Sequence, residues 1–146
     1  MVVSLALLVV ACSGPSEPEL LETMGGLEEQ VLLAGVYEGE SPERSRREIP
    51  CDRLLLPDQL ALEVTYKSPP MGPAEARERL TELRAVLESR DSIDGEDVKI
   101  VGDYMNGPPG AGGGFDVDVG EFSIAANYSP TSVDSALNVT FISPCY

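Results

Sequence analysis

Apolar residues recur along the chain at two periods, and the longer period of three to four residues predicts two helices. The first helix follows Ser16 and Glu19, whose spacing is that of a capping box. Its apolar stripe consists of Leu20, Met24, Leu27 and Val31. We expect Gly25–Gly26 to interrupt this helix and loosen its first turns, because each glycine costs about 1 kcal/mol relative to alanine. The second stripe, which follows Pro73, consists of Ala76, Leu80, Leu83 and Leu87.

The shorter period, in which apolar and polar residues alternate, predicts strands. It is clearest at residues 60–66 and returns at residues 98–104, after a turn at Asp94–Gly95. The last third of the chain also shows the β pattern, over residues 115–119, 122–126 and 136–142. The segment from Tyr37 to Pro50 is charged and shows no period, which predicts an exposed loop.

The order of these elements predicts the fold class. Short connections between the last strands favour an antiparallel meander. We therefore predict an α+β two-layer sandwich, in which two helices cover one face of an antiparallel sheet of about four strands.

The N-terminal pattern differs from the rest. Residues 1–10 are almost entirely apolar but too few to span a bilayer, and a Ser, Pro and Glu segment follows. Residues 1–11 therefore resemble a signal peptide, and Val9-Val10-Ala11-Cys12 resembles the bacterial lipobox. The resemblance implies a lipid on Cys12, a tether over residues 12–18 and a single domain over residues 19–146. Because no Lys or Arg precedes the apolar run, we expect the true start to lie upstream. In the alternative, the run is a core element and Cys12 a half-cystine.

The three cysteines fit this assignment. If Cys12 carries the lipid, Cys51 and Cys145 are left to form one disulfide in an oxidising compartment. We expect Cys51 to lie just before the first strand and Cys145 at the end of the last. Closing a loop on the order of a hundred residues removes roughly 4 to 5 kcal/mol of unfolded-state entropy.

Composition then excludes several function classes. The 146 residues include 25 Asp and Glu against 10 Lys and Arg, a net charge of −15 that repels nucleic acid. There is no His and no Trp, which removes Ser-His-Asp and Cys-His nucleophile systems and His-ligand zinc sites. We expect no enzyme activity and no cofactor.

One family resemblance extends over most of the chain after Cys12. Its last part is the pattern Gly-x-Phe-x-Ile, Leu-x-Val and Ser-Pro-Cys, which here is Gly120, Phe122, Ile124, Leu137, Val139, Ser143, Pro144 and Cys145. The chain resembles small cell-envelope lipoproteins of actinobacteria, including the mycobacterial LppA-like proteins. The resemblance implies a lipid-anchored protein on the extracytoplasmic face of the cell membrane. It offers no catalytic residue.

Candidate binding residues are few. Asp116, Asp118 and Glu121 are possible Ca²⁺ ligands, although a strand with Asp pointing outward has the same spacing. The glycine-rich segment Gly107–Gly114 could be mistaken for a phosphate cradle, but it lacks the P-loop Lys, and we expect a flexible hairpin connection.

The basic and aromatic residues leave alternatives open. Four arginines flank Cys51, and they suit either a lipid-headgroup or envelope-polymer contact or a solvated loop: Arg44, Arg46, Arg47 and Arg53. Four tyrosines suit the edge of the core better than a ligand platform: Tyr66, Tyr104, Tyr128 and Tyr146. Two glycosylation sequons begin at Asn127 and Asn138, and we discount them because the lipobox implies a bacterium.

We therefore expect a non-catalytic domain that is anchored to the membrane by its N-terminal lipid and binds an envelope protein or a small ligand. Two alternatives remain open. One is an envelope enzyme that uses carboxylates for acid/base chemistry, and the other is a secreted inhibitor or structural spacer.

Overall fold

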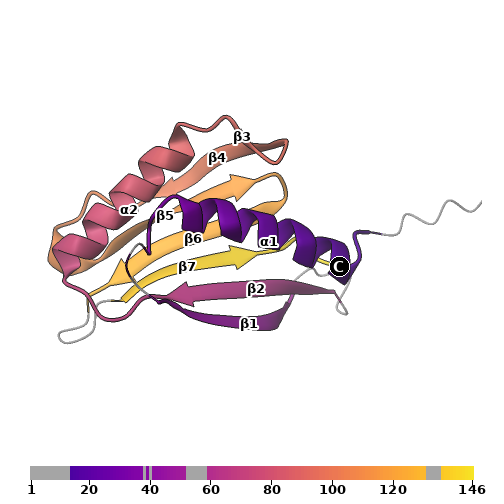
Figure 1. Cartoon of the computed structure of the whole chain (residues 1–146), viewed down its shortest axis with the longest axis horizontal. Coiled ribbons are helices and arrows are strands. Elements are labelled where there is room, and N and C mark those ends of the chain that lie inside the picture. Colours follow the sequence, from indigo (N-terminus) through magenta and orange to yellow (C-terminus); the bar gives the residue numbers. More distant parts are fainter. Residues whose placement is uncertain (1–13, 38, 40, 52–58, 131–135) are drawn as a thin grey trace, which may run out of the picture.

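Two helices cover one face of an antiparallel sheet in the computed structural model, which describes residues 14–37, 39, 41–51, 59–130 and 136–146 (Figure 1). The helices are α1 (Glu17–Leu33) and α2 (Pro73–Glu88), and η1 (Pro109–Ala111) is a short 3-10 turn. The strands are β1 (Glu43–Pro50), β2 (Leu60–Lys67), β3 (Ser92–Ile93), β4 (Glu96–Asp103), β5 (Gly113–Val119), β6 (Phe122–Ser129) and β7 (Ala136–Ile142). Their order across the sheet is β1-β2-β7-β6-β5-β4-β3. The predicted α+β class is confirmed.

Helix α1 begins where the capping box predicts. The backbone N–H of Ser16 donates to Glu19 Oε2 at 2.8 Å, which gives a partner to one of the amides at the start of the helix. The helix then continues without a break through Gly25–Gly26, so the expected interruption is wrong. Met24, Leu27 and Val31 are almost completely buried on both sides of the glycine pair, and this burial stabilises the helix through it.

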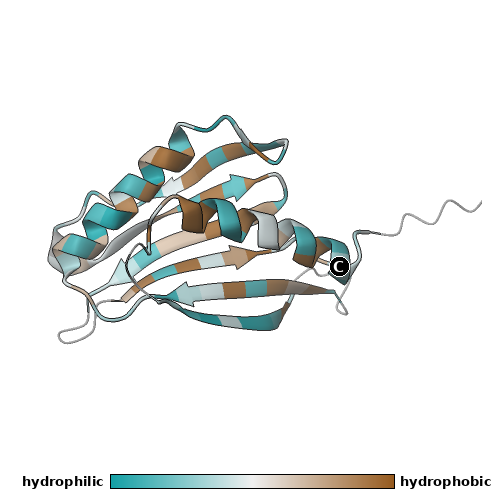
Figure 2. Cartoon of the chain, in the orientation of Figure 1, coloured by the Kyte–Doolittle hydropathy of each residue, from teal (hydrophilic) through white to brown (hydrophobic). Residues whose placement is uncertain are grey.

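The core lies between the two helices and the covered face of the sheet (Figure 2). Alternate residues of β2, β5, β6 and β7 are buried on this face, as the period of two predicts. They meet the stripes of α1 and α2. The largest completely or almost completely buried side chains include Phe115, Phe141, Leu62, Leu80 and Leu83.

The sheet has seven strands, and the prediction of about four is wrong. Strand β1 lies in the predicted loop between Tyr37 and Pro50, and β3 is a two-residue partner of β4. Seven of the eight residues of β1 are exposed, so neither of its faces is apolar and no alternation marks it. Strand β1 is stabilised by pairing along its whole length with β2, from Glu43 opposite Lys67 to Pro50 opposite Leu60.

The domain has two distinct ends (Figure 1). We call the end with the start of α1, the C-terminus and Cys145 the disulfide end. The opposite end contains the connection from β2 to α2, the segment between β4 and β5 and the end of β6. We call it the far end. Chain direction alternates from strand to strand, so residues distant in sequence meet at each end.

Candidate functional site

The residues of the predicted lipid anchor lie outside the described part of the chain. These are the signal segment 1–11 and Cys12. Helix α1 begins at Glu17, five residues after Cys12 and within the predicted tether 12–18. Within the described ranges, no helix combines the length and the apolar character that crossing a membrane requires.

The predicted bridge between Cys51 and Cys145 is present, with the two Cα atoms 6.2 Å apart. Cys51 precedes the strand expected over residues 60–66, as predicted, but the unpredicted strand β1 comes before Cys51, so the strand that follows it is the second, β2. Its N–H donates to Gln59 O at 2.9 Å, and Leu60 and Tyr146 exchange backbone hydrogen bonds of 3.1 and 2.9 Å. The bridge therefore joins two segments, one just after β1 and one just after β7, that backbone hydrogen bonds already hold together.

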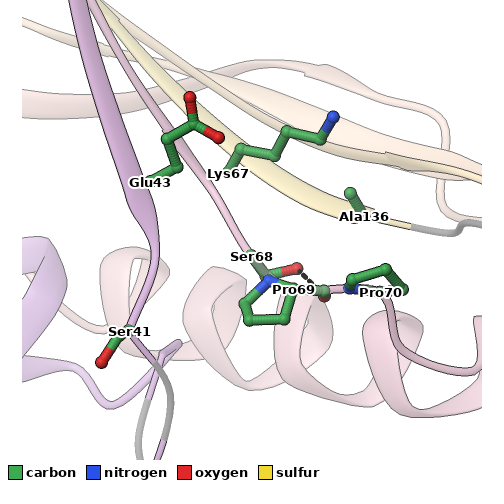
Figure 3. A pocket seen from close by; sticks show the side chains of 7 residues that line it. All are labelled: Ser41, Glu43, Lys67, Ser68, Pro69, Pro70 and Ala136. Atoms are coloured by element: carbon green, nitrogen blue, oxygen red, sulfur yellow. Dashed lines mark hydrogen bonds between the residues drawn. The ribbon is translucent and has the colours of Figure 1, made fainter.

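A hollow of about 390 Å³ opens at the far end of β1, β2 and β7 (Figure 3). It is lined by Ser41, Glu43, Lys67, Ser68, Pro69, Pro70 and Ala136. Glu43 and Lys67 are cross-strand neighbours, and neither forms an ion pair with another described residue. The Ser68 hydroxyl donates to Pro69 O at 2.8 Å and accepts from Leu137 N at 2.9 Å. The two hydrogen bonds occupy Ser68, so the hollow offers opposite charges and a proline wall to a ligand.

A second, shallow hollow of about 450 Å³ lies at the far end of β4, β5 and β6. It is lined by Tyr104, Gly107, Ala111, Gly112, Gly113, Asn127 and Tyr128, a set without a charged side chain. Gly112 has a φ of +79°, and a Cβ there would lie 2.8 Å from Tyr128 O, so this position requires glycine. The segment Gly107–Gly114 therefore forms a turn and the start of β5, and it offers no cation to a phosphate.

A third hollow, of about 400 Å³, lies toward the disulfide end, between α1 and the turn from β3 to β4. Leu27, Ile93, Val119 and Phe122 form its floor, and each is less than a tenth exposed. Little apolar surface is therefore available to a ligand there.

Glu28 is a buried carboxylate that the pattern analysis missed. Its Oε1 accepts from Tyr66 Oη at 2.9 Å and from Arg44 Nε at 3.0 Å, which ties α1 to β1 and β2. Burial, followed by the Glu28 carboxylate, raises the pKa of Tyr66. Glu28 is four residues after Met24 and three before Val31, and this place within the apolar stripe is the feature that could have revealed its burial.

Tyr37 was also missed, and it supports the same region of the core. Its hydroxyl donates to Tyr66 O at 2.9 Å and to Leu137 O at 3.3 Å. Burial raises its pKa well above the ordinary value. Tyr37 thereby links the segment after α1 to β2 and β7.

The candidate arginines do not form one free basic patch. Arg44 and Arg46 point toward α1, where they pair with Glu28 and Glu17, and Arg47 pairs with Glu63 on the uncovered face. Arg53 lies outside the described residues. Of the four candidate tyrosines, Tyr66 and Tyr128 are buried, Tyr104 is 48% exposed, and Tyr146 donates to Glu48 at 3.2 Å.

The acidic candidates are not brought together. Asp116 and Asp118 follow one another on the uncovered face of β5, and Glu121 lies in the turn to β6. Asp118 Oδ1 accepts from the Ser123 hydroxyl at 3.1 Å. Across the residues that the structure describes, no three His, Cys, Asp or Glu side chains form a group that could hold a metal ion.

Comparison with protein-family models, curated proteins and solved structures finds no match for this chain.

Proposed function

We propose that this protein is a lipid-anchored, non-catalytic binding module on the extracytoplasmic face of a cell membrane, and that it binds its ligand or protein partner at the far end. The observation that carries the proposal is the position of α1. Its first residue, Glu17, lies at the disulfide end and only five residues after Cys12 (Figure 1). Five extended residues span at most about 18 Å, so a lipid on Cys12 would keep the disulfide end close to the membrane.

The short tether, and not the surface charge, sets this orientation. Glu17, Glu19 and Glu22 lie in the first two turns of α1, and an anionic membrane surface would repel them, so the lipid on Cys12 must hold this end near the membrane. The far end would then point away from the membrane, and two of the three hollows described above open there. The disulfide supports the compartment, because such bonds persist in oxidising environments.

Non-catalytic binding is favoured by what the far-end side chains can do. In the hollow of Figure 3, the Ser68 hydroxyl is held by two backbone partners, whereas Glu43 and Lys67 have no ion-pair partner among the described residues. Opposite charges and a proline wall can orient a ligand. A catalytic hydroxyl would need a neighbouring base.

The anchor is tested by expression in an actinobacterium behind a positively charged signal n-region, followed by fractionation and mass spectrometry. We expect the wild-type protein in the membrane fraction with acyl chains on Cys12, and we expect Cys12→Ser to release it or block its processing. Ser13→Ala, one residue further along, is the matched control and should leave both properties unchanged. A mature N-terminus beyond Cys12, or an unmodified Cys12 in membrane-bound protein, would refute the anchor and favour a secreted spacer or inhibitor.

A further inference from the structure

On the uncovered face of the sheet, at the far end of β4 and β5, two side chains each lie opposite a glycine of the neighbouring strand. Tyr104 lies opposite Gly114, and Asp116 lies opposite Gly102. The N–H of Tyr104 donates to Gly114 O at 3.0 Å, and Gly102 is paired with Asp116. A Cβ on Gly114 would lie 2.8 Å from Tyr104 Cε2, and a Cβ on Gly102 would lie 2.9 Å from Asp116 Oδ2. Each large side chain therefore lies over the glycine of the neighbouring strand, which places the ring and the carboxylate at adjacent positions on one face.

Several polar side chains elsewhere on this face are engaged with one another, although Glu43, Lys67 and Lys99 have no hydrogen-bond or ion-pair partner among the described residues. The engaged pairs are Thr65–Thr140, Ser123–Asp118 and Arg47–Glu63. Within the described part of the chain, no hydrogen bond or ion pair engages the side chains of Tyr104, Asp116 or Asn127. Asp116 is half-buried, and its carboxylate has no hydrogen-bond or ion-pair partner among the described residues. Tyr104 is 48% exposed, an unusually high fraction for so large a ring in this domain.

The third side chain lies one strand further. Asn127 is directly opposite Gly114, and a Cβ on Gly114 would lie 2.8 Å from the Asn127 Cβ. Both Asn127 and Tyr104 line the shallow hollow of about 450 Å³, and no residue in that lining is charged. The amide oxygen of Asn127 adds a hydrogen-bond acceptor to the ring and the carboxylate.

The electrostatics determine the class of ligand. Asp116 contributes, after burial, to a raised pKa of Tyr104, so the two groups are close enough to interact. With a net charge of −15 on the chain and an unpaired carboxylate beside the ring, an anion would be repelled. An aromatic face and an unpaired carboxylate both attract a cation. A single carboxylate suits an organic cation better than a metal ion, which needs several ligands.

We propose that Tyr104, Asp116 and Asn127 form a binding site for an organic ammonium group, which lies against the Tyr104 ring and pairs with the Asp116 carboxylate. The site specifies organic ammonium compounds as the class of ligand that the far end binds. It rests on the proposed binding role of this end, but it does not depend on the lipid anchor.

A purely structural role for Tyr104 is the competing explanation. An aromatic ring that covers a glycine on a neighbouring strand can stabilise a sheet without binding a ligand. That role predicts a loss of thermal stability for Tyr104→Ala and no response to ammonium compounds. The structural explanation gives Asp116 no role, so the effect of changing Asp116 on ligand binding separates the two explanations.

The experiment is calorimetric titration of the purified full chain, held in a maltoside detergent, with choline and with n-butylammonium. The uncharged isostere 3,3-dimethylbutan-1-ol is titrated in parallel. We expect at least one of the two cations to bind about tenfold more tightly than the alcohol. A preference for choline would indicate a quaternary ammonium ligand, and a preference for n-butylammonium would indicate a primary amine such as a Lys side chain.

Four variants locate the site. Asp116→Asn should weaken binding about tenfold, whereas Asp118→Asn, the same change at the next position on this face, should leave it unchanged. Tyr104→Ala should weaken binding by about two- to thirtyfold, and Tyr104→Phe should retain it because the ring remains. Absence of binding by both cations, equal binding of the alcohol, or equal losses in Asp116→Asn and Asp118→Asn would overturn the proposal. Asp116→Asn and Tyr104→Phe keep it testable if Tyr104→Ala fails to fold.

Discussion

Removal of the Cys51–Cys145 bridge should destabilise this domain strongly, and the size of the effect follows from the chain. The two cysteines are 94 residues apart. In the chain-entropy account, opening a loop of this length returns about 16 cal/mol/K to the unfolded chain, which is about 4.7 kcal/mol at 25 °C. We therefore expect the double variant Cys51→Ala/Cys145→Ala to lose about 3 to 5 kcal/mol of unfolding free energy.

The structure indicates that this loss arises in the unfolded state. Leu60 and Tyr146 still exchange two backbone hydrogen bonds beside the bridge, and Ser143 N–H still donates to Leu62 O at 2.9 Å. These contacts keep the last residues of the chain on β2 when the sulfurs are removed. The folded double variant should therefore keep the native far-ultraviolet circular dichroism.

Urea unfolding, followed by circular dichroism, measures the difference. The oxidised protein and the double variant are compared in a Cys12→Ser background, so that Cys12 cannot form a competing disulfide. Because the open chain exposes more surface when it unfolds, the m-value of the double variant should be higher than that of the bridged protein.

Two results would refute this reasoning. One is a loss below about 1 kcal/mol with native dichroism, which would show that the bridge constrains the unfolded chain far less than its loop length requires. The other is a free thiol at Cys51 or Cys145 in the purified protein under denaturing conditions, which would show that the bridge does not form.

Two further predictions concern α1. Gly25→Ala should raise the unfolding free energy by about 1 kcal/mol, because the position is helical and no atom lies within 4 Å of the new Cβ. Gly26→Ala is the matched control and should gain less, since its Cβ would lie 3.1 Å from Asp94 Oδ2; equal gains in chemical denaturation would contradict the argument. The hydrogen bond from Ser16 N–H lowers the pKa of Glu19 below 4.5, so its contribution to stability is present above pH 4.5 and is lost as pH falls through the lowered value. Glu19→Gln should therefore lower the melting temperature at pH 7 and not at pH 2.5, and an equal deficit at both values would show that the carboxylate charge has no part in the cap.

The covered face of the sheet and the two helices could be predicted from the sequence, because burial on one side of an element leaves a periodic trace. Alternation over residues 60–66 marks β2, and the stripe after Pro73 marks α2. The pairing of Cys51 with Cys145 followed from the assumption that Cys12 carries a lipid, and the structure confirms the pairing.

Elements without a buried face leave no such trace. Strand β1 is polar on both sides and exists through backbone pairing with β2, a partner that alternation cannot identify. The glycine pair in α1 was expected to break the helix, because local propensity does not include the burial of Met24 and Leu27 around it.

The side-chain partnerships were decided by the tertiary structure alone. Burial of Glu28 depends on Tyr66, 38 residues away, and on Arg44 in a strand the sequence did not reveal. The placement of Tyr104 and Asp116 at adjacent positions on one face depends on the register between β4 and β5 and on the glycine opposite each of them. Sequence determines which side chains an element offers to its neighbours. Strand order and register determine which of them meet, because they set the distances between residues that are far apart along the chain.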